Sequence, residues 1–159
     1  MVIREIIPDD NKSIETIMTN CFKEFDLPTA GSSLEDDDVK LMFQGFQGKR
    51  AIYYVIEDNG NVFGGGGVKQ LQGAGSDTCE LQKMYFHPEA RGKGFGKKVF
   101  DLCMKAAKEF GYKYCYLESA SQLKSAIKLY ERNGFKHLKK PLGKTGHTIC
   151  GVYMLKELI

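Results

Sequence analysis

The chain has no tryptophan, only 4 prolines and no long apolar run among its 159 residues. A membrane-spanning helix needs ~18 consecutive apolar residues, and no stretch approaches that length. The first residues, MVIREIIPDD, have no long apolar core and do not resemble a secretory signal. Proline is too scarce, and the spacing of the 18 glycines too irregular, for collagen or a low-complexity chain. We therefore expect a cytoplasmic globular protein without a membrane partner.

Disulfide and metal motifs are also missing. The 5 cysteines are an odd number and form no C-x-x-C pair, which favours a reduced setting. His147 and Cys150 have the spacing H-x-x-C, but no further ligands stand nearby in the sequence, so we predict no metal site. Three other cysteines lie among apolar residues and should be core residues: Cys79, Cys103 and Cys115.

The positive charge is modest and unevenly placed. The formal net charge is +3, which is too small to indicate a nucleic-acid-binding protein. Residues 91–113 nevertheless carry an excess of basic side chains, which is typical of a solvated helix face or of a binding site for a small polyanion. The aromatic residues in this segment, Phe100 and Phe110, fall on the apolar face of the expected helix. They are therefore not placed to stack on bases, and we expect no nucleic-acid partner.

Hydrophobic periodicity predicts one mixed α/β (α+β) domain over residues 1–159. Aromatic and β-branched runs are typical of strands, and Asp58-Asn59-Gly60-Asn61 predicts a hairpin turn between two of them. Apolar residues at helical spacing predict amphipathic helices. The expected strands are 2–7, 51–57, 62–72, 79–88, 114–119, 135–138 and 147–158, and the expected helices begin near residue 9 and cover 41–46, 94–110 and 121–133.

A glycine-rich turn stands between the third long strand and the helix that follows. It reads Arg91-Gly92-Lys93-Gly94-Phe95-Gly96, an R-x-x-G-x-G pattern. Free N–H groups at a helix start attract phosphate, and glycine lets the backbone approach without a Cβ. Lys97 stands where a dinucleotide fingerprint has its third glycine, and Lys98 where a Walker A loop has Ser or Thr. The sequence therefore predicts another kind of phosphate or pyrophosphate cradle, with Lys97 among the countercharges.

Two blocks of the sequence resemble the GNAT superfamily of acetyl-CoA-dependent N-acetyltransferases. Residues 84–96, MYFHPEARGKGFG, resemble the family's central strand and pyrophosphate loop, and LYERNGF at 129–135 resembles a family signature. The order of elements fits from residue 2 to residue 158, although the N-terminal third matches in element order alone. The resemblance implies a mostly antiparallel sheet of six to seven strands, flanked by about four helices and splayed at its central strands.

The resemblance also implies how acetyl-CoA, the co-substrate, binds. In the family the pantetheine arm lies in the gap of the splayed sheet like an added strand. Backbone groups of Met84, Tyr85 and Phe86 should bond the pantetheine and polarise the acetyl carbonyl. N–H groups from Arg91 to Gly96 should hold the pyrophosphate. Many relatives have an asparagine seven residues before the family tyrosine, but Leu123 stands there, which separates this chain from that pattern.

The implied reaction is direct attack of a primary amine on the acetyl thioester, without a nucleophilic cysteine. Tyr130 matches the family tyrosine near the cofactor sulfur, where it would protonate the departing thiolate; core packing is the alternative role. An alkylammonium of pKa ~10 must lose a proton before attack. Glu80 is the first candidate for that base, and Glu118 is the second. If the strand alternates regularly, Glu80, Gln82 and Met84 share one face.

The resemblance also implies that the acceptor amine, which could be a small molecule or part of a protein, lies between 26–46 and 139–151. There, the aspartates from Asp36 to Asp38 could attract a cation or could simply be solvated. His147 and Cys150 could line the pocket, and His147 could also accept a proton.

The glycine run in the second long strand has more than one interpretation. The four glycines from Gly64 to Gly67 indicate close approach of a substrate, a side chain or a bulge. The sequence also leaves the acyl group open, since it could differ from acetyl, and a non-catalytic acyl-CoA sensor could have the same fold. The protein could be a monomer or a homodimer.

Overall fold

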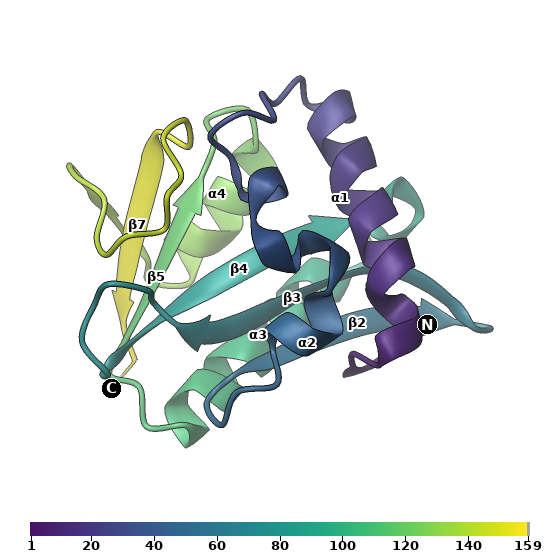
Figure 1. The fold of residues 1–159 in the computed structure, drawn as a ribbon, viewed down its shortest axis with the longest axis horizontal. Helices are drawn as coiled ribbons and strands as arrows, with labels where there is room; N and C mark the ends of the chain where they lie inside the picture. The colour runs from purple at the N-terminus through teal and green to yellow at the C-terminus, as the bar shows by residue number, and fades with distance from the viewer. Residues whose placement is uncertain (159) are drawn as a thin grey trace.

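A seven-stranded sheet runs through the centre of the molecule, with helices on both faces (Figure 1). The computed structural model describes residues 1–158. Its strands are β1 (Val2–Glu5), β2 (Ile52–Asp58), β3 (Asn61–Gln70), β4 (Thr78–Phe86), β5 (Tyr114–Ser119), β6 (Lys136–Leu138) and β7 (Val152–Glu157). Its α-helices are α1 (Asn11–Glu24), α2 (Met42–Gly45), α3 (Phe95–Glu109) and α4 (Lys124–Arg132), and its 3₁₀ turns are η1 (Pro8–Asp10), η2 (Ser33–Glu35), η3 (Asp37–Lys40) and η4 (Pro88–Ala90).

The strand order is β1-β2-β3-β4-β5-β7-β6, and every neighbouring pair is antiparallel except β4 and β5. The β4–β5 pairing covers only Thr78–Glu80 against Tyr114–Tyr116, so the two strands separate beyond Glu80. The predicted fold, a mostly antiparallel sheet splayed at its centre, is confirmed. Since β4 continues to Phe86, its last six residues have no ladder to β5.

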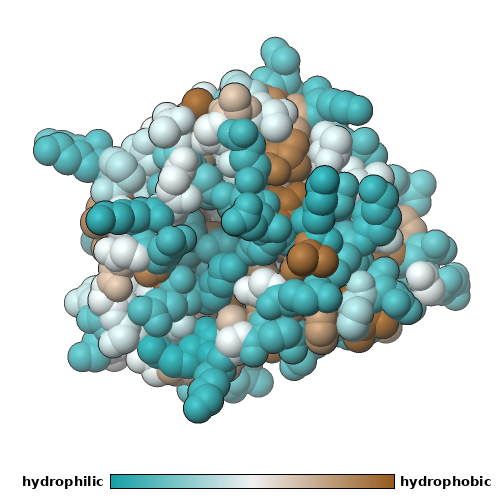
Figure 2. Space-filling view, viewed as in Figure 1, coloured by the Kyte–Doolittle hydropathy of each residue, from teal (hydrophilic) through white to brown (hydrophobic). Residues whose placement is uncertain are grey.

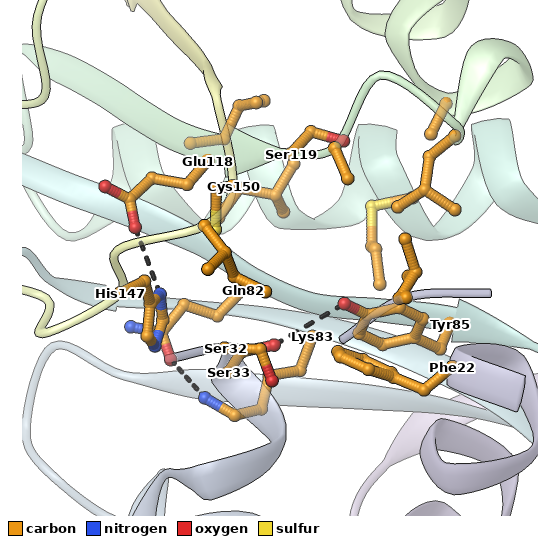
Figure 3. A pocket seen from close by; sticks show the side chains of 18 of the residues that line it. Phe22, Ser32, Ser33, Gln82, Lys83, Tyr85, Glu118, Ser119, His147 and Cys150 are labelled. Atoms are coloured by element: carbon orange, nitrogen blue, oxygen red, sulfur yellow. Dashed lines mark hydrogen bonds and ion pairs between the residues drawn. The ribbon is translucent and has the colours of Figure 1, made fainter. Parts of the chain in front are cut away.

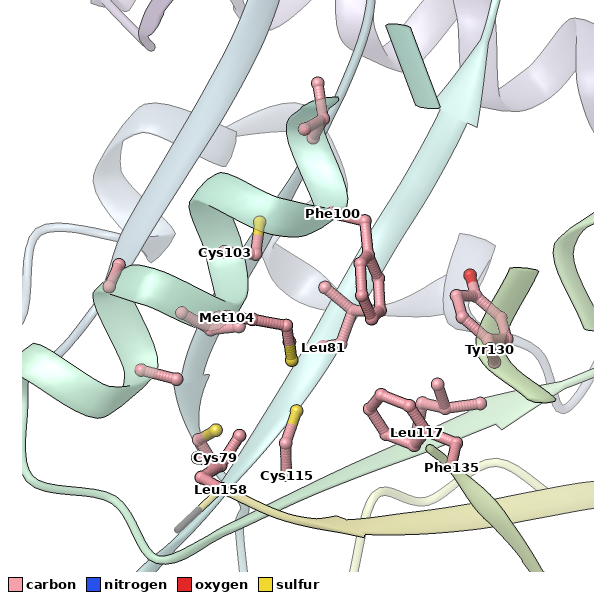
Figure 4. Close-up of a cluster of buried hydrophobic side chains, with 14 of the residues drawn as sticks. Cys79, Leu81, Phe100, Cys103, Met104, Cys115, Leu117, Tyr130, Phe135 and Leu158 are labelled. Carbon is pink, nitrogen blue, oxygen red and sulfur yellow. The ribbon is translucent and has the colours of Figure 1, made fainter. Parts of the chain in front are cut away.

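Each face of the sheet has its own core. Behind the sheet, α3 buries an apolar face that includes Phe100 and Cys103, and the predicted core cysteines are fully buried (Figure 4). In front, α1 and α2 cover a smaller core around Tyr53 (Figure 1). The surface on this front side is mainly hydrophilic, with a narrow apolar strip near its centre (Figure 2). Within residues 1–158, no helix has the length and apolar character needed to cross a membrane.

The four glycines in β3 make room for neighbouring side chains. A Cβ on Gly65 would lie 2.6 Å from Cε1 of Tyr53, and a Cβ on Gly67 would lie 2.7 Å from Cδ2 of the same ring. A Cβ on Gly66 would lie 2.4 Å from Cγ of Met84 on the opposite face. The tyrosine ring therefore lies across β3, where its hydroxyl donates a hydrogen bond of 2.7 Å to the carbonyl of Lys83 in β4. Neighbouring side chains, and not a substrate, explain three of the four glycines: Tyr53 explains Gly65 and Gly67, and Met84 explains Gly66.

The hydrogen-bonded carbonyl belongs to a β-bulge. Gly65 pairs with Tyr85 and Gly67 pairs with Gln82, so two residues of β4 face a single residue of β3. Lys83 has a φ of 54°, a left-handed conformation that is uncommon outside glycine. The extra residue reverses the alternation of side chains along β4.

Because of this bulge, the expectation that Met84 shares a face with Glu80 and Gln82 is wrong. Met84 points toward α3, where it meets the same glycine as Val99. Glu80 and Gln82 point to the opposite face, where they line a cavity with Asp36. Met84 and Phe86 do share the α3 face, and Tyr85 packs on the other face against Phe22, with ring centroids 5.7 Å apart.

The last strand is shorter than its sequence indicates. A strand was expected over 147–158, but β7 begins at Val152. Residues 139–151 form an irregular segment in which three glycines have positive φ values: Gly143, Gly146 and Gly151. Left-handed glycines interrupt extended pairing, so this segment is free to fold over the sheet. The expected helix over 121–133 is likewise trimmed to α4, Lys124–Arg132.

We predict that Gly65→Ala lowers the free energy of unfolding by about 1–3 kcal/mol, the range for overpacking a core site. The new Cβ would lie 2.3 Å from the backbone oxygen of Tyr54, an atom that cannot rotate away. Gly48→Ala is the matched control, because its nearest neighbour would be 3.9 Å from the new Cβ. Urea unfolding of both variants measures the difference, and equal stabilities would contradict this packing of Tyr53 across β3.

Candidate active site

The separation of β4 from β5 opens a groove between β4 and α4. This groove has a volume of about 600 Å³. Six residues of the predicted cofactor set and the predicted acid line it: Met84, Tyr85, Phe86, Arg91, Gly92, Gly96 and Tyr130. Leu123, which stands where many relatives have asparagine, and the adjacent Gln122 line it as well. The groove has the length and the exposed strand edge that an extended ligand requires.

The glycine-rich turn forms the end of this groove next to α3. Gly92 and Gly94 have φ values of 72° and 82°, and a Cβ on either would meet nothing within 4 Å. Gly94 caps α3, so the N–H groups of the first turn, beginning at Phe95, have no intrahelical partner. The backbone here is both left-handed and open to solvent, which suits close approach of an anion.

Four residues of the predicted cofactor set do not line the groove. Lys93 and Gly94 lie in the open turn, Phe95 packs at the edge of the α3 core, and Lys97 forms an exposed ion pair with Asp101. Gly94 and Phe95 could reach an anion only through their backbone. The charge of Lys97 is partly compensated within its own helix.

Arg91 has a structural connection that the sequence did not indicate. Its Nη2 and Nε donate to the carbonyl of Phe86 at 2.7 and 3.1 Å. Its other contacts reach α1, where Nη1 and Nη2 donate to the carboxylate of Glu24. The side chain therefore joins the glycine-rich turn, the end of β4 and the end of α1, while its backbone remains in the turn.

A second cavity of about 160 Å³ opens on the other side of β4 (Figure 3). It meets the groove at residues that line both, among them Met84, Tyr85 and Tyr130. We call it the acceptor cavity. Its outer walls come from two irregular segments: Leu27, Pro28, Ser32 and Ser33 from one, and His147, Ile149 and Cys150 from the other.

Tyr130 lies at the junction of the groove and the acceptor cavity. It is 6% exposed, and its ring packs between Phe100 and Phe135 with centroid distances of 6.2 and 5.9 Å. Burial raises the pKa of its hydroxyl, so the group stays protonated at neutral pH. Packing fixes the ring, and the protonated hydroxyl is available as a donor where the two spaces meet.

Glu80 lines the acceptor cavity on β4 and is only 5% exposed. Burial first, and then the charge of Glu118, raise its pKa to about 7. The charge of Lys83 and a 2.6 Å hydrogen bond donated by Gln82 act in the opposite direction. A carboxyl group with this pKa exchanges protons readily at neutral pH.

Lys83 is a buried cation that the sequence did not single out. Its side chain is 2% exposed, and Nζ lies 2.8 Å from Asp36, 3.1 Å from Gln82 Oε1 and 3.4 Å from Asp38. Regular alternation would point Lys83 toward α3, and only the bulge turns it to the acidic side. Asp36 and Asp38 are therefore not free carboxylates, because each pairs with cations of the chain itself, although both stay partly exposed.

Glu118 lies near the end of β5, and both oxygens of its carboxylate are engaged. It accepts hydrogen bonds from Tyr116 and Thr145, both at 2.7 Å, and lies 3.0 Å from Nδ1 of His147. Burial acts to raise its pKa, but these hydrogen bonds lower it below the usual range. Glu118 is ionised at neutral pH but already paired, which makes it a poorer proton acceptor than Glu80.

His147 bridges two carboxylates. Its Nδ1 faces Glu118, and its Nε2 lies 2.8 Å from Oδ1 of Asp36 (Figure 3 shows the Glu118 side). Cys150 lies near this bridge, and ligand atoms of Glu118, His147 and Cys150 fall within 4.8 Å of one another. Both imidazole nitrogens are engaged with carboxylates. The structure thus places His147 and Cys150 in the lining of the acceptor cavity, one of the positions that the sequence allowed for them.

Comparison with known proteins adds independent information. The model of the acetyltransferase (GNAT) family matches residues 13–135. YjgM of Escherichia coli (strain K12), named as an uncharacterized N-acetyltransferase, is 43% identical over 158 residues, which cover 99% of this chain and 95% of that protein.

Solved structures share the fold. An acetyltransferase of the GNAT family from Staphylococcus aureus Mu50 superposes with a TM-score of 0.88 at 19% identity, with 99% of each chain covered. The acetyltransferase yncA from Salmonella typhimurium, solved with its cofactor acetyl-CoA, has a TM-score of 0.80 at 22% identity, covering 100% of this chain and 94% of that one. With the family model spanning most of its length and a relative 43% identical across nearly all of it, the chain belongs to the acetyltransferase (GNAT) family.

Proposed function

We propose that this protein is an N-acetyltransferase, a single domain over residues 1–159, that transfers acetyl from acetyl-CoA to a primary amine by direct attack. The observation that carries the proposal is the junction of the groove and the acceptor cavity at Met84, Tyr85 and Tyr130. Two reactants that enter from opposite sides would meet there. The buried phenol of Tyr130 lies at this junction and the buried carboxyl of Glu80 lines the acceptor cavity, which favours catalysis over a non-catalytic acyl-CoA sensor.

The groove fits acetyl-CoA in shape and in donor chemistry. The unpaired edge of β4 at Met84, Tyr85 and Phe86 offers backbone groups to the pantetheine amides. The open turn from Arg91 to Gly96 offers N–H groups to the pyrophosphate, and Lys93 and Lys97 add positive charge. Bound there, acetyl-CoA supplies an acetyl thioester, and a β4 N–H polarises its carbonyl.

Glu80 acts as the general base in this proposal. With its pKa near 7, it is largely ionised at slightly alkaline pH and accepts a proton from the substrate ammonium, directly or through water. Gln82 orients the carboxylate by donating to Oε1. The free amine then attacks the acetyl carbon, and the C–N bond forms as the C–S bond breaks.

Tyr130 acts as the general acid. Its protonated hydroxyl lies where the groove meets the acceptor cavity, so it can donate a proton to the departing thiolate. We further propose that the reaction uses no metal ion and that the protein works in the cytoplasm as a monomer or homodimer, with a small-molecule or protein amine and with no nucleic-acid or membrane partner. The buried free thiols fit a reduced compartment.

We predict that acetyl-CoA and CoA raise the melting temperature, while single-stranded DNA does not. A ligand present at 100 times its Kd stabilises a protein by about 2.7 kcal/mol. Thermal unfolding measures this shift, and a thiol reagent then measures CoA release with a panel of primary amines. Absence of a shift with acetyl-CoA would overturn the cofactor assignment, and binding without amine-dependent release would favour the sensor.

We predict that Glu80→Gln lowers kcat/KM by roughly 10²–10³-fold, within the range for losing a general base. The wild-type profile should rise with pH through an apparent pKa of about 7, set by Glu80. The variant should lose this limb and keep only the limb of the amine's own ionisation. Glu118→Gln is the comparison variant, and it should keep the limb; its loss there instead would transfer the role to Glu118.

Glu80→Gln should also change how the stability of the protein depends on pH. The folded-state pKa of Glu80 is raised from 4.5 to about 7, so ionisation between these values costs more in the folded state than in the unfolded state. This carboxyl therefore contributes less to stability as pH rises from about 5 to 8. The melting temperature of Glu80→Gln relative to wild type should increase across that window, and a constant difference would contradict the raised pKa.

We predict that Tyr130→Phe lowers kcat by about 10–100-fold with little change in the KM for acetyl-CoA. The ring still packs against Phe100 and Phe135, so the melting temperature should stay close to that of wild type. Tyr112→Phe is a matched control, because its hydroxyl donates to the carbonyl of Arg50 and neither residue lines the groove or the acceptor cavity. Full activity of Tyr130→Phe would exclude the acid role.

A further inference from the structure

The acceptor cavity has a neighbour that the proposed reaction does not use. A second cavity of about 390 Å³ lies beside it, and three side chains line both spaces: Glu80, Gln82 and His147. We call this neighbour the acidic cavity. Its remaining lining is mostly polar and acidic, namely Glu35, Asp36, Asp37, Asp38, Lys69, Gln70, Gln72 and Thr145. The two cavities are therefore separated by side chains and not by backbone alone.

His147 is the most firmly held of the three shared side chains. Its two ring nitrogens are engaged on opposite sides, with Glu118 at 3.0 Å and Asp36 at 2.8 Å. Its backbone N–H also donates to Thr145 Oγ1 at 3.2 Å. The side chain is 9% exposed. With both nitrogens engaged, the ring cannot swing aside without breaking a buried interaction.

Charge also holds the His147 ring in place between the two cavities at neutral pH. Burial acts against protonation of His147, but its hydrogen bonds, the one to Asp36 first, raise its pKa to about 12. The ring is then an imidazolium between two carboxylates. The other ionisable groups around it are Glu80, Lys83 and Cys150, of which Lys83 is already paired with Asp36. Each carboxylate would be left without this charge partner if the ring moved away.

We propose that His147 is the specificity-determining wall of the acceptor cavity, and that it limits acceptors to amines that do not extend into the acidic cavity. This inference rests on the proposed N-acetyltransferase function. The geometry is direct: the imidazole lines both spaces, and the space beyond it is more than twice as large as the acceptor cavity. Removing the ring would join the two.

The chemistry of the acidic cavity defines which longer amine would then enter. Four consecutive acidic residues, Glu35 to Asp38, line it. Asp36 and Asp38 are already paired with Lys83, Lys69 and His147, so the carboxylates open to a ligand are Glu35 and Asp37, which form no ion pair within residues 1–158. A second ammonium group would be attracted there, whereas an uncharged alkyl tail would not. The joined cavity should therefore prefer diamines and polyamines over alkylamines of equal length.

The test compares His147→Ala with wild type on butylamine, hexylamine, 1,6-diaminohexane and spermidine, by acetyl-CoA-dependent CoA release. We expect the ratio of kcat/KM for spermidine to that for butylamine to rise at least tenfold in the variant, with a smaller rise for hexylamine. His147→Gln, which retains most of the volume, is the matched control and should keep the wild-type ratio. An unchanged ratio in His147→Ala, with activity lost equally on all amines, would contradict the proposal that His147 separates the two cavities.

A double variant guards against a folding defect. Removing the imidazolium takes the shared charge partner from Asp36 and Glu118, and Asp36→Asn in the same chain removes one of these charges while its amide oxygen can still accept from Lys83. Melting temperatures of both variants show whether the fold is retained. The double variant should show the same shift toward longer amines.

Calorimetry separates this inference from the proposed function. Spermidine should bind the CoA complex of His147→Ala at least tenfold more tightly than the wild-type complex. If neither protein releases CoA from acetyl-CoA with any of the amines but this gain in binding is present, the proposed function fails, while the role of His147 as a wall between the two cavities is retained. If neither the binding nor the rate ratio changes, the partition is wrong whatever the activity.

Discussion

One buried hydrogen bond fixes the β-bulge of β4 at the centre of the sheet. Tyr53 reaches across the glycines of β3 and donates to the carbonyl of Lys83, within the bulge of β4. Any side chain at Gly65 or Gly67 would collide with the tyrosine ring. The donor is completely buried, so losing its partner would leave an unsatisfied polar group in the core. Gly65 and Gly67 therefore give a large ring the room to fix a left-handed backbone position in β4.

The bulge determines which charged side chain of β4 faces the site. It turns Lys83 toward Asp36 and Asp38 and returns Met84 to the α3 side. A buried cation is tolerated only when carboxylates surround it, and here they do. The same cation restrains the pKa of Glu80, which burial and Glu118 would otherwise raise further. Backbone geometry and acid–base chemistry are thus linked through one side chain.

Local patterns were predictable from sequence, and distant pairings were not. The glycine-rich turn could be predicted because it depends on consecutive residues, whereas Tyr130 was assigned by the resemblance alone, because its neighbours Phe100, Met84 and Tyr85 come from distant elements. Lys83 could not, because a single inserted residue reverses strand alternation and leaves no compositional mark. The partnership of His147 with Asp36 joins positions 111 residues apart, which no spacing rule connects. The length of the final strand was overestimated because the alternation of side chains over 147–158 was given more weight than Gly146 and Gly151, which interrupt the extended backbone.

That separation along the chain has a consequence for how the protein folds. The wall of the acceptor cavity joins an early loop, at Asp36, to a late one, at His147. Contacts between residues this far apart in sequence have a high entropic cost of loop closure, so they form after the sheet has brought the two loops together. We expect the strands to pair first and this wall to assemble last. It belongs to irregular segments and not to the ladder, so its residues can change without disturbing the folding nucleus. Substrate preference can therefore diverge in this family while the sheet stays constant.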